Sequence, residues 1–285
     1  MAKDDYATPG KDADRIENGM YLSGLHVYPI KSCAGIPLRT AEVDGRSIRH
    51  DRRWMLVDRN GVFLSQREIP RLSLIRVSIA EDGLVLEAPG MPDLRMPFES
   101  EGGPMLARVW DDPVETVSVG RESDIWFSQF LGVSCRLVYL PDRSVRPVDP
   151  VYAQPGDRVG LADGFPFLMI SEASLDDLNG RLDEPLPMDR FRPSLVVRGC
   201  EPFAEDGWGC VRVGGITFRV VKPCARCKIT TVDQASAETG KEPLRTLATY
   251  RKVGSEVYFG QNLIHDSTGV LNVGDAVEVI EPRVV

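Results

Sequence analysis

The chain has 285 residues, of which 42% are hydrophobic, and its formal net charge is -8. This size allows one large or two modest cores, and the acidic balance argues against nonspecific nucleic-acid binding, which depends on excess Lys and Arg. No apolar run approaches the ~18 residues of a membrane span, so we expect a soluble protein that binds no nucleic acid and no membrane.

The N-terminal segment and the cysteines indicate the compartment. Residues Met1–Asn18 are polar and lack the apolar stretch of a secretory signal, and we expect residues 1–19 to form a disordered tail. Six cysteines in a chain of this length do not make a disulfide scaffold, so we expect free thiols in a reducing, cytoplasmic compartment. With three histidines, histidine-rich metal chemistry is not expected.

Strand signals dominate the rest of the chain. Short β-branched or alternating runs are separated by Gly, Pro and Asp clusters, which is typical of sandwiches and barrels. The sequence predicts strands over residues 24–28, 54–57, 73–79, 114–119, 135–139, 194–197, 216–221, 229–232 and 276–280. The expected fold class is therefore mostly β with a few helices.

Helical patterns are few. Residues 123–131 carry a Ser cap and end before Gly132, and residues 174–182 open with Ser174 and Asp177 as a capping box. Residues 243–250 begin with a proline suited to a first helical turn.

A break in the pattern near residues 141–155 indicates two domains. Asp, Pro and Arg cluster there without apolar periodicity. We expect a β-barrel-like N-terminal domain over residues 20–143 and a second β-barrel domain over residues 144–285.

The segment 222–233 carries the strongest chemical signal. Cys224 and Cys227 lie three residues apart, and Lys222, Arg226 and Lys228 surround them. Positive charge nearby favours the thiolate, the form that attacks electrophiles and binds soft metals.

The residues of this motif leave four interpretations open. Half of a zinc site needs a second pair, for which only Cys200 and Cys210 are available, at an unusual spacing. A thioredoxin-like dithiol needs a helix after the motif, where the sequence is β-prone, and buried structural thiols are opposed by the flanking charges. The fourth interpretation is one thiolate bound to a soft, high-valent metal on an anionic organic cofactor.

Other segments supply candidate groups for an anion. Lys31 and Ser32 lie in a proline-led turn after a strand. Arg52 precedes a strand that begins with an aromatic residue, and Arg192 precedes an aliphatic strand. Asp163, in an Asp-Gly turn, could accept hydrogen bonds from a heterocycle. Taken alone, the Lys31 and Arg52 segments are more typical of an ordinary turn and a solvated strand end, Asp163 is typical of a turn, and Arg192 is equally typical of a solvated loop edge.

Taken together, these segments resemble the MOSC family, named for the C-terminal domain of molybdenum-cofactor sulfurases. The resemblance covers residues 22–279. In the second half it rests on residues 165–171, 191–194, 204–208, 224–233, 259–262 and 271–275. The first half resembles the β-barrel domain that precedes MOSC in the amidoxime-reducing members, through residues 28–33, 51–54 and 66–67.

The resemblance implies a molybdenum–molybdopterin cofactor (Moco) in the cleft between the domains. Cys227 would be the catalytic residue and the protein ligand to the metal, and Cys224 would be structural or auxiliary. The implied cofactor-binding residues are Lys31, Ser32, Arg52, Asp163, Arg192, Ala225, Arg226 and Asn262. The implied activity is reduction of small N-hydroxylated substrates: amidoximes, N-hydroxylated bases and hydroxylamines.

The family comparison also sets expectations about partners. We expect neither the membrane anchor of the mitochondrial members nor the ferredoxin-like domain of some bacterial ones, and the sequence has no cysteine run for an iron–sulfur cluster. Electrons would then come from a separate donor protein that is ferredoxin-, flavodoxin- or cytochrome b5-like.

Two functions of other classes stay open. One is a molybdenum-cofactor or sulfur carrier, in which Cys227 holds a persulfide or a pterin for transfer without turnover. The other is a structural metal-binding module.

Overall fold

The computed structural model describes residues 19–100 and 102–283, so the tail expected at residues 1–19 lies outside the described range except for its last residue. The expected mostly β class is confirmed, because strands dominate the described residues. In chain order the strands are β1 (Tyr21–Val27), β2 (Ile36–Leu38), β3 (Thr40–Val43), β4 (Trp54–Val57), β5 (Arg76–Ile79), β6 (Gly83–Glu87), β7 (Leu94–Pro97), β8 (Pro104–Val109), β9 (Asp112–Ser118), β10 (Arg136–Tyr139), β11 (Phe167–Ser171), β12 (Leu195–Arg198), β13 (Trp208–Val213), β14 (Ile216–Ala225), β15 (Lys252–Val253), β16 (Glu256–His265), β17 (Gly269–Asn272) and β18 (Val277–Pro282).

The helices are short. The α-helices are α1 (Arg121–Leu131), α2 (Glu172–Asn179) and α3 (Leu244–Leu247), and the 3-10 helices are η2 (Pro70–Leu74), η3 (Met188–Arg190), η4 (Ala204–Gly207) and η5 (Lys228–Thr231). No helix of the described residues has both the length and the apolar character needed to cross a bilayer.

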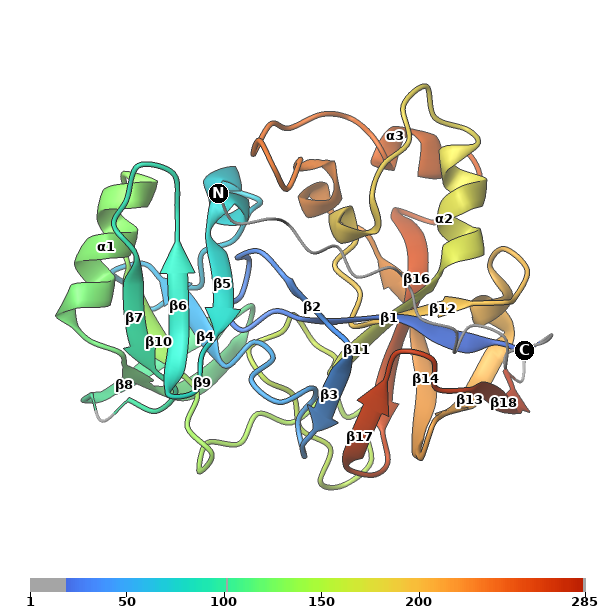
Figure 1. Cartoon of the computed structure of the whole chain (residues 1–285), viewed down its shortest axis with the longest axis horizontal. Helices are drawn as coiled ribbons and strands as arrows, with labels where there is room; N and C mark the ends of the chain where they lie inside the picture. Colours follow the sequence, from blue (N-terminus) through green and yellow to red (C-terminus); the bar gives the residue numbers. More distant parts are fainter. Residues whose placement is uncertain (1–18, 101, 284–285) are drawn as a thin grey trace, which may run out of the picture.

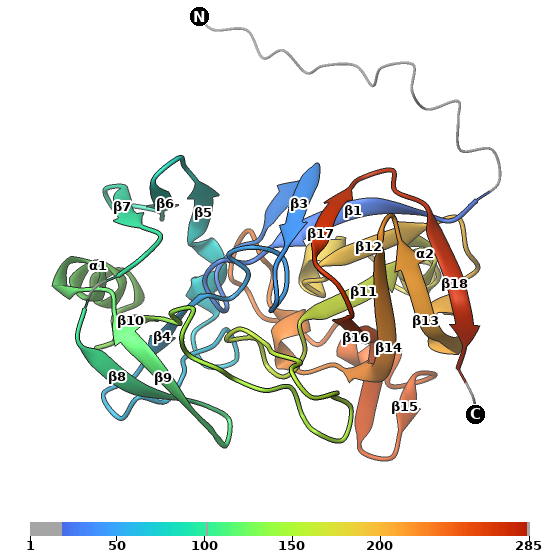
Figure 2. The same ribbon diagram turned by 90° about the horizontal axis from the view of Figure 1, so that it is seen from below.

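The strands form two lobes (Figure 1). The right-hand lobe contains a 9-stranded sheet in the order β18-β13-β14-β16-β11-β12-β1-β2, with β15 paired to β16. The left-hand lobe contains the sheets β4-β10-β9-β8 and β5-β6-β7, and α1 packs against β10 and β7. Figure 2, turned by 90°, shows the same separation of α1 and β4–β10 from the larger sheet.

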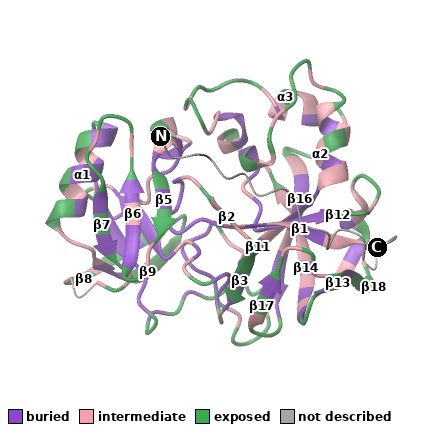
Figure 3. Cartoon of the chain, viewed as in Figure 1, coloured by how far each residue is buried: buried purple, intermediate pink, exposed green. Residues whose placement is uncertain are grey.

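Each lobe buries its own apolar cluster. Strands of the large sheet supply one cluster, including Leu22, Phe167 and Phe218. Strands of the other lobe and α1 supply a second, which includes Trp54 and Phe127. Figure 3 shows that buried residues concentrate on the strands of both lobes.

The first strands of the chain join the sheets of the right-hand lobe. β1 pairs with β12, and β3 pairs with β17. Residues 21–43 are thus hydrogen-bonded to strands formed far later in the sequence, and the division at residue 143 stays a prediction.

Two predicted helix starts are wrong for a local reason. α2 begins after Ser171, whose hydroxyl accepts a hydrogen bond from the Ser174 amide, so Ser174 lies inside the helix and not at its cap. α1 begins after Gly120 and not at Ser123, although Gly132 ends it in the left-handed conformation, as predicted.

The strand predicted at residues 229–232 is wrong. This segment is the 3-10 helix η5. The hydroxyls of Thr230 and Thr231 donate to the carbonyls of Cys227 and Lys228, at 3.0 and 2.8 Å. Such local side-chain bonds offer the backbone an alternative to a strand ladder, and here they outweigh the β propensity of Thr and Ile.

Gly35 makes room for Tyr28 between the lobes. A Cβ atom at Gly35 would lie 2.4 Å from the Tyr28 ring, closer than real atoms approach. The Tyr28 ring is buried, and its hydroxyl donates to the Pro193 carbonyl at 3.1 Å. Gly35 is therefore needed for space and not for an unusual backbone conformation.

We predict that Gly35→Ala lowers the free energy of unfolding by roughly 1–3 kcal/mol, because the Tyr28 ring must move out of a packed position. Urea unfolding measures this change. Gly45→Ala is the matched control, since a Cβ there meets nothing within 4 Å. Equal stability of the two variants would contradict the steric role.

Candidate functional site

A pocket of about 550 Å³ lies between the lobes and collects the predicted site residues. It is lined by all nine of them: Lys31, Ser32, Arg52, Asp163, Arg192, Ala225, Arg226, Cys227 and Asn262. They come from the loop after β1, the start of β4, the turn before β11, the segment between η3 and β12, the end of β14, and β16. Segments more than 200 residues apart in the sequence therefore meet in one cavity.

Backbone strain concentrates at this pocket. Seven non-glycine residues of the described chain have positive φ, and four of them line it: Ser32 (70°), Arg52 (43°), Trp110 (57°) and Arg192 (57°). Such conformations cost of order 1–3 kcal/mol each and cluster at ligand sites, where the surroundings enforce them. The strain aims these side chains at the cavity.

Tyr28 holds two of the strained arginines. The guanidinium groups of Arg52 and Arg192 lie 4.4 and 4.3 Å from the centre of its ring. Its amide donates to Asp51, whose carboxylate also accepts from Arg52 at 2.6 Å. Burial raises the pKa of the Tyr28 phenol to about 12, so the ring stays neutral.

Asp163 is clamped by two cations. Lys31 pairs with one carboxylate oxygen, and Nη2 of Arg67 lies 2.9 Å from the other. Desolvation alone would raise the pKa of Asp163, but these cations hold it well below its usual range. The carboxylate is therefore ionised, and its side chain keeps 48% of its surface exposed toward a ligand.

Arg67 belongs to the site although the sequence analysis did not assign it. Burial tends to lower its pKa, but Asp163 and the Cys227 sulfur outweigh this effect and raise it. Arg67 thus lies beside both Asp163 and the Cys227 thiol. Its place within the 66–67 segment of the family resemblance is the signal that could have identified it.

The two thiols of the motif are held differently. Cys227 caps η5 and is half-buried in the pocket wall. Cys224 accepts a hydrogen bond from Nη1 of Arg226 at 3.0 Å, and the same guanidinium donates to the Phe191 carbonyl at 2.6 Å. Arg226 is therefore anchored to Cys224 and not to Cys227.

Three pocket cations have no acidic partner among residues 19–100 and 102–283. Arg192, Lys222 and Arg226 face aromatic rings and form no ion pair there. Nε of Arg226 is buried and has no hydrogen-bond partner. Partly buried positive charge without compensation is unfavourable unless an anion supplies the missing contacts, so the donor set fits an anionic group such as a phosphate.

Asn262 and Ala225 line the pocket through the sheet. Asn262 lies on β16, opposite Lys222 of β14 and Leu168 of β11. Ala225 is exposed at the end of β14, where a small side chain keeps the approach to Cys227 open. Their roles toward a cofactor stay predictions.

The structure gives little support to a zinc site or a thioredoxin-like dithiol at Cys224 and Cys227. No group of three or more His, Cys, Asp or Glu residues gathers in a metal-binding arrangement within the described part of the chain. All six cysteines are free, so Cys224 and Cys227 do not form a disulfide, and the short η5 is not the α-helix of a thioredoxin-like motif.

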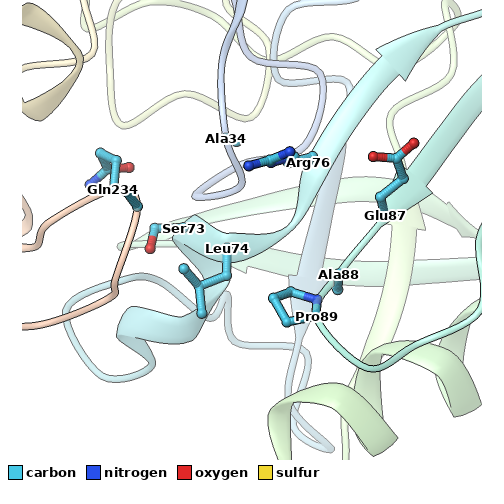
Figure 4. A pocket seen from close by; sticks show the side chains of 9 residues that line it. Ala34, Ser73, Leu74, Arg76, Glu87, Ala88, Pro89 and Gln234 are labelled. Carbon is cyan, nitrogen blue, oxygen red and sulfur yellow. The ribbon is translucent and has the colours of Figure 1, made fainter. Parts of the chain in front are cut away.

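A second pocket, of about 390 Å³, lies beside η2 and the β5–β6 hairpin (Figure 4). Arg76 and Glu87 are opposite each other on its strands, and Gln234 approaches from the other lobe. It contains one cation balanced by one acid and no thiol. None of the predicted residues lines it, so it does not compete with the first pocket for the proposed chemistry.

A comparison of Arg192 with Arg146 tests which arginine binds a ligand and which stabilises the fold. Arg146 donates to Asp112 and to three carbonyls, whereas Arg192 has no acidic partner in the region described. We predict that Arg146→Gln lowers the free energy of unfolding by roughly 2 kcal/mol or more. Arg192→Asn, which tolerates positive φ, should leave stability equal or higher yet remove stabilisation by added sulfate.

Urea unfolding with and without sulfate measures both effects. Loss of stability in Arg192→Asn without loss of the sulfate response would contradict a ligand-binding role for this residue.

The pKa of Lys31 predicts how the affinity for an anion depends on pH. Burial lowers its pKa from 10.5 to about 8, although Asp163 raises it in part. In the folded protein Lys31 therefore binds fewer protons than the unfolded chain between about pH 8 and 10.5, and its contribution to stability improves with rising pH in that window. A bound dianion favours the charged form, so sulfate affinity should be constant below pH 8 and fall above it.

Sulfate-induced shifts of the unfolding midpoint at pH 7 and 9.5 test this expectation. Lys31→Met should bind sulfate more weakly and lose the pH dependence. A pH dependence that persists in this variant would mean that another group titrates.

Comparison with known proteins places the chain in a family. Residues 19–134 match the MOSC N-terminal beta barrel domain, and residues 156–278 match the MOSC domain. The chain is 35% identical to mitochondrial amidoxime-reducing component 1 of Mus musculus, over 93% of this chain and 84% of that protein. The human protein of the same name is 34% identical, over 91% of this chain and 82% of its own length.

A larger protein also contains a region similar to this chain. Molybdenum cofactor sulfurase of Danio rerio is 33% identical over 95% of this chain, which spans 35% of that protein. The resemblance stated from the motifs is thereby confirmed. Two domain matches in order, and relatives aligned over most of their length, mean that the chain belongs to the MOSC family of mitochondrial amidoxime-reducing components.

Proposed function

We propose that this protein is a molybdenum-cofactor-dependent reductase of N-hydroxylated compounds, including amidoximes, N-hydroxylated bases and hydroxylamines. The observation that carries the proposal is the set of uncompensated cations beside a half-buried thiol in one pocket. An anionic pterin phosphate would supply the missing charge, and a soft thiolate suits a metal of this kind. The names of the relatives, mitochondrial amidoxime-reducing components, support the same activity.

Seven of the nine pocket residues would contact the cofactor directly. Arg52, Arg192, Lys31 and Ser32 would donate to its phosphate and ring, Asp163 would accept from the pterin, and Cys227 would ligate the metal. Arg226, with its free Nε, would add a donor beside the thiol. Charge-assisted hydrogen bonds of this type contribute about 1.5–3 kcal/mol each.

The reaction needs little acid–base machinery from the protein. Conversion of N–OH to N–H takes up two electrons and two protons and releases water. When bound, the cofactor supplies the two-electron chemistry that removes the oxygen. The protein's own groups orient the substrate, and Nζ of Lys31, with its pKa lowered to about 8 by burial, can hold a proton at the pocket wall at neutral pH.

The carrier alternative keeps one supporting observation. A molybdenum cofactor sulfurase is among the relatives, and the anchored Cys224–Arg226 pair beside Cys227 would suit sulfur or cofactor transfer equally well. In that function Cys227 would bear labile sulfane sulfur and the protein would show no turnover.

The proposal also includes the electron donor and the cellular location. We expect a separate electron-donor protein that is ferredoxin-, flavodoxin- or cytochrome b5-like. We propose a cytoplasmic location from the cysteine usage of the sequence, whereas the relatives are named as mitochondrial.

Exchange of the two thiols tests the function. Freshly purified protein should contain about one molybdenum per chain, as a single-thiolate site requires, and should reduce benzamidoxime with a chemical electron donor. Cys227→Ala should lose the metal and the activity, while its unfolding midpoint should stay close to that of the cofactor-free wild-type protein, because the thiol is half-buried. Cys224→Ala should lose less.

Elemental analysis and an amidoxime assay measure these outcomes. Equal loss of metal from both variants would overturn the single-ligand assignment, and labile sulfur without molybdenum would favour the carrier.

A further inference from the structure

Trp110 occupies an unusual position at the pocket. It lies in the two-residue turn between β8 and β9, which are strands of the left-hand lobe in Figure 1. Its side chain lines the pocket, and 49% of its surface is exposed. Its φ is 57°, in a region that turns normally fill with Gly, Asn or Asp. The other three tryptophans, Trp54, Trp126 and Trp208, are buried.

The indole is held in place by its neighbours. The ring of Phe63 packs against it edge to face at 5.1 Å, and the Arg67 guanidinium lies 4.7 Å from its centre. Arg67 is itself fixed by Asp163 at 2.9 Å. The ring is therefore packed against Phe63 and Arg67, lines the pocket and stays half-exposed, which suits a stacking surface.

Arg67 and Trp110 share this pocket with the Cys227 thiol. All three residues line it, and the guanidinium of Arg67 lies over the Trp110 ring. A strained backbone and an exposed apolar ring both oppose folding without a ligand, and stability alone gives no reason for this residue.

We propose that Trp110 selects the substrate by stacking on its planar, delocalised part. The favoured class is aryl amidoximes and N-hydroxylated aromatic bases, in preference to aliphatic N-hydroxy compounds, which offer no ring. The inference rests on the proposed reductase function and adds a residue that determines its specificity. Stacking of a base or aryl ring on an aromatic side chain is strong enough to change affinity about tenfold.

The test uses the full-length holoprotein and two probes that share the N-hydroxy group, benzamidoxime and acetamidoxime. Because Trp110 is the exposed indole of the four, benzamidoxime should quench the wild-type tryptophan fluorescence and acetamidoxime should not. Trp110→Ala should abolish this quenching and raise KM for benzamidoxime about tenfold, with KM for acetamidoxime changed less than about twofold. Trp110→Phe should restore most of the preference.

Leu106→Ala is the control, since Leu106 is exposed on β8 and lies outside the pocket. Equal changes for both probes in Trp110→Ala, or unaltered quenching, would overturn the role of Trp110. Wild-type protein that shows quenching but reduces neither probe would overturn the reductase function while leaving the stacking role supported.

Discussion

The architecture of this protein depends on positive charge that the chain leaves uncompensated in the pocket between its lobes. Tyr28 holds Arg52 and Arg192 at its ring, and only Arg52 has an acid beside it. The buried Arg146, by contrast, is paired with Asp112 and with backbone carbonyls. The contrast indicates that the pocket cations are held for a ligand, and that folding supplies the free energy that keeps them there.

The sheet topology explains how these groups are held together. β1 and β3 cross to strands of the C-terminal half, so the loop carrying Lys31 is attached to the same sheet that carries Asn262. Positive φ angles then direct individual side chains inward. A rigid, strained cage of this kind binds an anion without reorganisation, which favours tight retention of a cofactor and leaves the substrate side to Arg67 and Trp110.

That the nine residues line one pocket could be predicted from the short motifs of the family resemblance, although Asn262 lies within β16 and not at its end. The nine residues converge although composition and periodicity say nothing of which strands are neighbours. β16 was missed because Gly260, with φ of 80°, and polar Gln261 interrupt its apolar pattern, yet both are buried in the sheet. The strand expected at residues 229–232 failed because two threonine hydroxyls bond locally. No sequence motif marks Trp110, because the turn that carries it meets the other pocket residues only in the folded protein.

Diffraction at the molybdenum absorption edge from crystals of the freshly purified protein would show directly whether the pocket holds the cofactor. We expect one anomalous peak at bonding distance from the Cys227 sulfur, with a phosphate in contact with the guanidinium groups of Arg192 and Arg226. A peak elsewhere in the molecule, or a phosphate that avoids those two groups in protein containing stoichiometric molybdenum, would contradict it.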